Sequence, residues 1–113
     1  MINNSFYQTL SENLQSANLF ISIGEENKAR VIARQVAGKA IRSLLQEINI
    51  ISSSSVNPYQ CLIIAKENYE IFSNLMEDLN ALTLKVNPDY TFPEELDLIK
   101  SAKNILDFVK EFN

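Results

Sequence analysis

Apolar side chains recur every three or four residues along four segments of the chain, with polar side chains between them. This spacing places the apolar side chains on one face of an α-helix. It predicts helices over residues 5–22, 25–51, 58–85 and 93–112. Because the connections are short, consecutive helices should pack antiparallel. We therefore expect an all-α protein in which residues 1–113 form a single domain, an antiparallel up-down-up-down four-helix bundle.

Residues that commonly begin or end helices support these boundaries. Gly24 suits the left-handed conformation in which many helices end, and the serine run at 52–55 interrupts the periodicity. Asn57 is a favourable N-cap, and Pro58 fits the first helical position, where its missing N–H is not needed. The sequence Asn-Pro-Asp at 87–89 is typical of a turn.

The predicted helix over 25–51 has two different faces. Ala29, Ala33 and Ala37 follow one another at intervals of four residues, so a neighbouring helix can approach closely on that side. Gly38 lies at the edge of the same stripe, where close packing would explain a residue that costs about 1 kcal/mol relative to alanine inside a helix. The opposite face carries basic side chains, including Lys28, which makes it unusual in this chain.

Composition excludes several kinds of chemistry. Two glycines and three prolines leave little material for the many tight turns of an all-β fold. The chain has no histidine, which removes imidazole catalysis and histidine-ligated metal sites. With a single cysteine, Cys61, it forms no intramolecular disulfide and no thiolate zinc site. We therefore expect no catalytic residues and no cofactor.

Charge and hydropathy indicate the class of partner. The net charge is −4, whereas nucleic-acid-binding proteins usually carry a basic surplus, so no nucleic acid is expected. The first residues lack the basic and apolar regions of a secretory signal. No stretch approaches the roughly 18 apolar residues of a membrane-spanning helix. These features favour a soluble, cytoplasmic protein that does not contact a membrane.

Charge is unevenly distributed along the chain. The helix predicted over 25–51 is basic, whereas Lys85 is the one basic residue within the acidic stretch 67–97. Lys28, Lys39 and Arg42 can therefore form a docking surface for an acidic partner. The same charges can instead pair with acids of the protein itself or remain solvated. Unchanged binding after replacement of Lys39 and Arg42 would favour the second interpretation.

Two apolar residues of the first helix lie outside its apolar stripe. Leu19 and Ile23 are one turn apart on the outer face, where they can form a partner-binding or homo-oligomer surface. Single apolar residues are also normal on protein surfaces. Their exposure in the folded chain therefore decides how they are interpreted.

Four acidic residues form two pairs with helical spacing. Glu67 and Glu70 are separated by two residues, as are Glu94 and Asp97. Paired E-x-x-[ED] motifs on neighbouring helices resemble those of all-α nucleotide pyrophosphohydrolases of the MazG type. The resemblance covers these four acids and implies a Mg²⁺ site that holds a phosphate chain. The helical phase places Glu67 and Glu70 opposite the apolar stripe, which disfavours this hypothesis unless a second subunit covers them.

Two further residues in the predicted helix over 58–85 have alternative interpretations. Cys61 lies on the apolar stripe in the first turn, where burial as a small hydrophobic residue is favoured over a reactive thiol. Asn68 falls in the middle of the same stripe, and a buried asparagine needs hydrogen-bond partners. In helical bundles such a residue can fix the register of packing.

These observations lead by elimination to a protein that acts by protein–protein interaction. Small helical bundles commonly serve as adaptors, export chaperones, immunity proteins or inhibitors, which is an analogy at the level of fold. One alternative is a structural subunit of a homo-oligomer. The other is a Mg-dependent nucleotide phosphohydrolase that uses Glu67, Glu70, Glu94 and Asp97.

Overall fold

A computed structural model describes residues 4–84 and 97–112, and helices connected by short loops make up these ranges. The helical elements are α1 (Asn4–Ser22), α2 (Glu26–Glu47), α3 (Pro58–Glu67), α4 (Tyr69–Phe72), the 3₁₀ turn η1 (Ser73–Leu75), α5 (Met76–Thr83) and α6 (Leu98–Glu111). The all-α prediction is confirmed for this part of the chain, which contains no strand. None of its helices combines the length and apolar character needed to cross a membrane. The positions 93–96, predicted as helical, and the turn at 87–89 lie outside the described residues.

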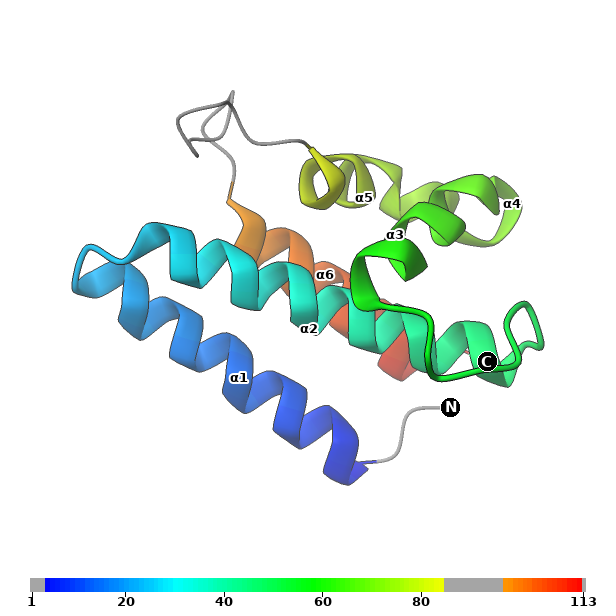
Figure 1. Ribbon diagram of the computed structural model, residues 1–113, viewed down its shortest axis with the longest axis horizontal. Helices are drawn as coiled ribbons and strands as arrows, with labels where there is room; N and C mark the ends of the chain where they lie inside the picture. Colours follow the sequence, from blue (N-terminus) through cyan, green and yellow to red (C-terminus); the bar gives the residue numbers. More distant parts are fainter. Residues whose placement is uncertain (1–3, 85–96, 113) are drawn as a thin grey trace.

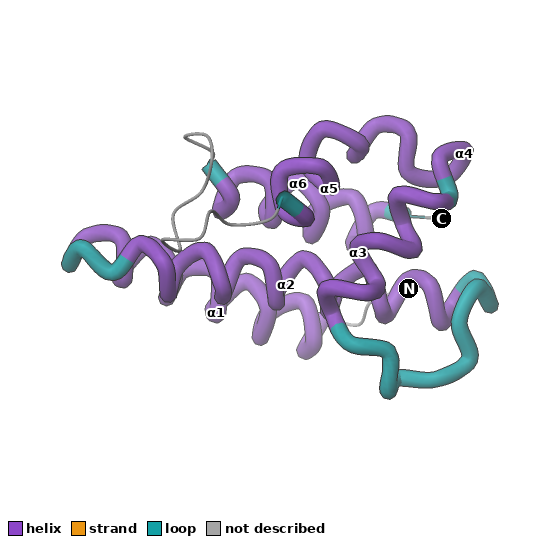
Figure 2. Tube along the Cα trace, turned by 45° about the horizontal axis from the view of Figure 1, so that its top comes forward, coloured by secondary structure: helices purple, strands orange, loops and turns teal. Residues whose placement is uncertain are grey.

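Helix α2 occupies the centre of the structure and packs against α1, α3 and α6 (Figure 1). Helix α6 also contacts α1 and α5, so the elements enclose one hydrophobic core. Ala29, Ala33 and Ala37 are fully buried in α2, which confirms the prediction that this face allows close helix contact. In the turned view, α3, α4 and α5 form a bent segment above α2 (Figure 2).

The chain interrupts the third predicted helix at Asn68. Its backbone has φ −108° and ψ 58°, outside the helical region. Its side-chain Nδ2 donates to the carbonyl of Ile64 at 2.8 Å, which replaces the backbone bond that a continuing helix would make there. Its own carbonyl accepts from the backbone N–H groups of Ile71 and Phe72 and so starts α4. The prediction of one helix over 58–85 is therefore wrong, and the up-down-up-down arrangement of four helices is not confirmed.

Side chains from α2 and α3 hold the C-terminal end of α5. Arg34 donates from Nε to the carbonyl of Leu82 at 2.7 Å and from Nη2 to that of Leu84 at 3.0 Å. Tyr59 lies under the Arg34 guanidinium and donates its hydroxyl to the carbonyl of Thr83 at 3.1 Å. Carbonyls at a helix C-terminus lack partners within the helix and carry partial negative charge, so a cation there is favourable. Part of the basic character of α2 therefore stabilises the protein's own fold.

Helix α2 ends four residues before the predicted boundary at residue 51. Asn49 adopts a left-handed conformation with φ 63°. The N–H of Asn49 bonds to the carbonyl of Gln46, and the N–H of Ile50 bonds to the carbonyl of Leu45 at 2.9 Å. This pair of bonds is the Schellman arrangement, in which asparagine is the usual substitute for glycine. The predicted N-cap of α3 is confirmed, because Asn57 Oδ1 accepts from the backbone N–H of Gln60 at 2.8 Å.

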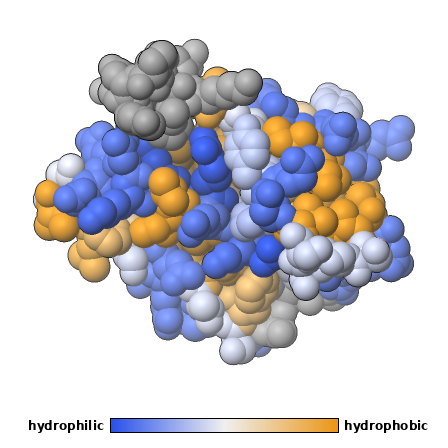
Figure 3. Space-filling model, in the orientation of Figure 1, coloured by the Kyte–Doolittle hydropathy of each residue, from blue (hydrophilic) through white to orange (hydrophobic). Residues whose placement is uncertain are grey.

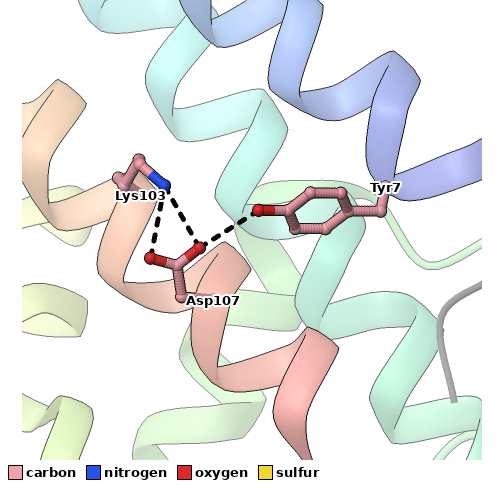
Figure 4. A network of polar contacts seen from close by, with 3 residues as sticks. All are labelled: Tyr7, Lys103 and Asp107. Atoms are coloured by element: carbon pink, nitrogen blue, oxygen red, sulfur yellow. Dashed lines mark hydrogen bonds and ion pairs between the residues drawn. The ribbon is translucent and has the colours of Figure 1, made fainter. Parts of the chain in front are cut away.

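A polar contact joins the first and last described helices (Figure 4). Tyr7 of α1 donates its hydroxyl to Oδ1 of Asp107 in α6 at 3.2 Å, and Lys103 forms an ion pair with the same carboxylate at 3.2 Å. The Nζ of Lys110 lies 4.1 Å from the centroid of the Tyr7 ring. Burial and then the negative charge of Asp107 raise the pKa of Tyr7 above its usual value, so its hydroxyl remains a donor at neutral pH.

Candidate protein-interaction surface

The hairpin formed by α1 and α2 turns at Gly24. This glycine has φ 83°, its N–H bonds to the carbonyl of Ile21 at 3.0 Å, and the N–H of Glu25 bonds to the carbonyl of Phe20 at 2.8 Å. The prediction of a glycine-terminated helix is therefore confirmed. Ile23 is the residue just before Gly24, so the tight turn leaves its side chain at the very end of the hairpin.

Large apolar side chains are exposed at this end of the molecule. Leu19 is 68% exposed, Ile23 70%, Val31 55% and Ile21 45%. Within the described part of the chain, Tyr69 is the one other large apolar residue with comparable exposure. We call Leu19, Ile21, Ile23 and Val31 the hairpin-end patch, a set defined by exposure and by position on the α1–α2 hairpin; Ile21 and Val31 line separate hollows. Their gathering on one hairpin distinguishes them from the scattered apolar residues that are normal on surfaces.

The space-filling view shows apolar atoms at the left end, where α1 meets α2, and a second apolar area on the right over α3 and α4 (Figure 3). The second area differs in exposure. The aliphatic side chains of α3 and α4, such as Ile64 and Ile71, are half-buried or buried and pack on the core. The hairpin-end patch is therefore the more accessible of the two.

Two members of the patch were not singled out from the sequence. Ile21 falls on the apolar stripe of α1, so sequence periodicity predicts it to be buried. Instead it lines an open hollow of about 470 Å³ together with Leu98 and Ile99 at the start of α6. Val31 lies among the polar residues of α2 and does not belong to the helix's apolar stripe. An apolar residue on a polar face is itself expected to be exposed, so the sequence could have identified it.

Lys28 lies beside the patch. Its Nζ is 5.7 Å from the centroid of the Phe20 ring and 4.0 Å from a carboxylate oxygen of Glu25. Both partners of this ion pair are at least half exposed, and pairs of that kind contribute little to stability. The Lys28 ammonium is therefore held near the apolar surface while remaining accessible to another molecule.

A shallow groove follows the seam between α1 and α2 away from the hairpin end. Its first hollow, of about 360 Å³, is lined by Phe20, Lys28, Val31 and Ile32 with Asn27. Its second hollow, of about 230 Å³, is lined by Asn13, Ser16, Ile32, Gln35, Val36 and Lys39. The two hollows share Ile32, so we refer to them together as the α1–α2 groove. One end of it adjoins the hairpin-end patch through Val31.

The structure separates the three predicted basic binding residues. Lys28 and Lys39 both line the α1–α2 groove. Arg42 is half-buried and donates from Nη1 to the carbonyl of Val56 at 3.2 Å, which attaches the loop before α3 to α2. Replacing Arg42 would therefore disturb that loop. A double replacement of Lys28 and Lys39 consequently tests binding more cleanly than a double replacement of Lys39 and Arg42.

The four acidic residues of the proposed magnesium site are placed as follows. Glu67 ends α3 and Glu70 lies in α4, so the break at Asn68 separates them, and both are exposed. Asp97 is the N-cap of α6 and accepts from the backbone N–H of Lys100 at 3.0 Å. Glu94 lies outside the described residues. Residues 4–84 and 97–112 contain no group of three or more potential ligands that could hold a metal ion, and the magnesium hypothesis stays a prediction.

The buried thiol of Cys61 provides a test of the packing between α2 and α3. Its side chain is fully buried and its Sγ lies 3.8 Å from the carbonyl of Val56. Burial raises the pKa of Cys61 above its usual value, although the charge of Arg42 opposes this. Because the folded-state pKa is raised, the stabilisation from the neutral thiol is present below the unfolded-state pKa and is lost as pH rises through the folded-state pKa.

We therefore expect Cys61 to react slowly with an aromatic disulfide reagent at pH 8 in the folded protein and rapidly in concentrated urea. The measurement is the absorbance of the released thiolate over time. Fast reaction without denaturant would contradict the buried, protonated state.

Comparison with known proteins gives no further identification. The chain matches no family model, and searches of curated proteins and of solved structures gave no match. Functional inference therefore rests on the geometry of the surface described above.

Proposed function

We propose that this protein acts by binding another protein through the hairpin-end patch. The observation that carries the proposal is the concentration of exposed large apolar side chains, Leu19, Ile21, Ile23 and Val31, on one hairpin. Burying an exposed leucine or isoleucine contributes about 1.5–3 kcal/mol, so two or more such residues supply enough free energy to dominate a small interface. This is the role of an adaptor, chaperone, immunity protein or inhibitor.

The test replaces Leu19 and Ile23 together by serine. Both side chains are more than two-thirds exposed, so we expect the thermal unfolding temperature to change little. We expect the variant to lose most of the partner recovered by the wild-type protein in affinity capture from the native cells, quantified by mass spectrometry. The matched control is Tyr69→Ser, which removes an exposed apolar side chain from α4 instead.

Two outcomes would contradict the proposal. Equal recovery of the same partners by the wild-type and the Leu19/Ile23 variant would show that the patch is not an interface. Equal loss in the Tyr69→Ser control would show that capture depends on general surface hydrophobicity. The homo-oligomer alternative is tested by sedimentation at several concentrations, where a second copy covering the patch would appear as a dimer that the Leu19/Ile23 variant does not form.

A further inference from the structure

The chemical character of the α1–α2 groove differs from that of the protein as a whole. The net charge of the chain is −4, yet the groove contains the ammonium groups of Lys28 and Lys39. Among the described residues, no acidic side chain lines either hollow. Lys39 forms no ion pair with the described part of the chain, and the pair of Lys28 with Glu25 is long and exposed. The groove is therefore a strip of positive charge available to an anionic partner.

Apolar and hydrogen-bonding groups in the groove define the partner further. Phe20, Val31 and Ile32 make the end nearest the hairpin apolar. Asn13, Ser16 and Gln35 supply hydrogen-bonding groups farther along. A ligand with both apolar side chains and carboxylates would satisfy both ends, as an amphipathic helix does when it lies in a groove.

The spacing of the two lysines matches that of a helix. Lys28 and Lys39 are 11 residues apart on α2, which corresponds to about 16 Å along the helix axis and about three turns. Residues 11 positions apart lie on the same face of a helix. If a second helix lies along α2, two of its carboxylates can therefore face Lys28 and Lys39 when the carboxylates are also 11 residues apart.

We propose that the α1–α2 groove binds an acidic amphipathic helix of a partner protein. Its apolar side chains contact Phe20, Val31 and Ile32, and its carboxylates pair with Lys28 and Lys39. This proposal rests on the protein-binding function proposed above and names the chemistry of the partner segment. The concave seam between two helices fits a rod-shaped segment better than a flat membrane surface.

The experiment uses two synthetic 18-residue helical peptides with the same leucine and alanine pattern. One carries glutamates 11 residues apart and the other carries lysines at those positions. Binding is measured by fluorescence anisotropy of labelled peptide and mapped by ¹⁵N amide chemical shifts of the full chain. We expect the acidic peptide to bind more tightly than the basic one and to shift the amides of Phe20 and of 28–39, leaving those of α6 unchanged.

A charge reversal tests the role of the two lysines. In the variant Lys28→Glu with Lys39→Glu we expect affinity for the acidic peptide to fall about tenfold, as two reversed surface ion pairs imply. We expect affinity for the basic peptide to rise in the same variant. The control compares single reversals: Lys100→Glu, at an exposed position of α6, changes net charge as much as Lys39→Glu does and should leave both affinities unchanged. Equal affinity of the two peptides for the wild-type protein, or equal effects of the two single reversals, would overturn the proposal.

Other occupants of the groove have distinguishable outcomes. Binding to anionic phospholipid vesicles without binding of the acidic peptide would assign the groove to a membrane surface and overturn the proposal. A dimer in sedimentation that the lysine reversal abolishes would assign it to a second copy, with the same consequence. If the Leu19/Ile23 variant loses its partner while the lysine reversal does not, the proposed function stands and this inference fails.

Discussion

Replacement of Phe72 by alanine is expected to lower the free energy of unfolding by about 3–5 kcal/mol, measured by urea denaturation. Phe72 is fully buried and is among the largest side chains of the core. Its ring centroid lies 5.9 Å from that of Phe108 in α6, so the residue attaches the short helix α4 to the last helix. Because a domain of this size is stable by only about 5–15 kcal/mol, the loss is a large part of the total.

The matched control is Tyr69→Ala on the same short helix. Tyr69 is 64% exposed, and removing it should change the free energy of unfolding by less than about 0.5 kcal/mol. A Phe72 variant as stable as the Tyr69 variant would show that α4 does not pack on the core as described. It would thereby contradict the folded-back arrangement of α3, α4 and α5.

Replacement of Gly38 by alanine is expected to destabilise the protein by about 2 kcal/mol, although alanine is the better helix former. Intrinsic preference alone favours alanine by about 1 kcal/mol. However, a Cβ built at position 38 would lie 2.5 Å from the Cβ of Pro58 and 2.6 Å from its carbonyl carbon, and it would meet the carbonyl oxygen as well. Overpacking of this kind costs about 1–3 kcal/mol or more, because α3 must move away from α2. Whether Gly38→Ala lowers or raises the free energy of unfolding therefore tests the contact between Gly38 and Pro58.

Gln35→Ala provides the comparison on an exposed position of the same helix. Its thermal unfolding temperature should stay close to that of the wild-type protein. Stabilisation by alanine at both positions would mean that the start of α3 does not lie against Gly38. Gly38 lies against Pro58 at the start of α3, and Cys61 is buried in the first turn of the same helix, so the destabilised variant should also expose this thiol to faster labelling.

The candidate surface was predictable only in part. Leu19 and Ile23 lie out of phase with their own helix, and this local fact predicts their exposure without knowledge of any other element. Ile21 is in phase and still exposed, because burial depends on whether another element covers that end of α1. Lys28, Lys39 and Arg42 look equivalent in sequence, but Arg42 reaches a carbonyl of the loop before α3 whereas the two lysines line the groove.

By itself, the sequence determined the helical class, the close-packing face of α2 and the turn at Gly24. These features depend on periodicity, side-chain size and backbone preference, which act over a few neighbouring residues. Asparagine also favours the left-handed conformation that ends a helix, so Asn49 could have predicted the end of α2. Because Asn49 lies among isoleucines, the apolar pattern predicted a longer helix instead.

Only the tertiary structure decided the break at Asn68 and the use of Arg34 to hold the end of α5. The apolar period continues past Asn68, so the pattern favours a single rod. The chain bends there because the asparagine side chain satisfies the carbonyl of Ile64 and because α5 then packs against both α3 and α6. Arg34 and Leu82 are distant in sequence, and a contact between such residues does not affect the periodic pattern of apolar positions from which the helices were predicted.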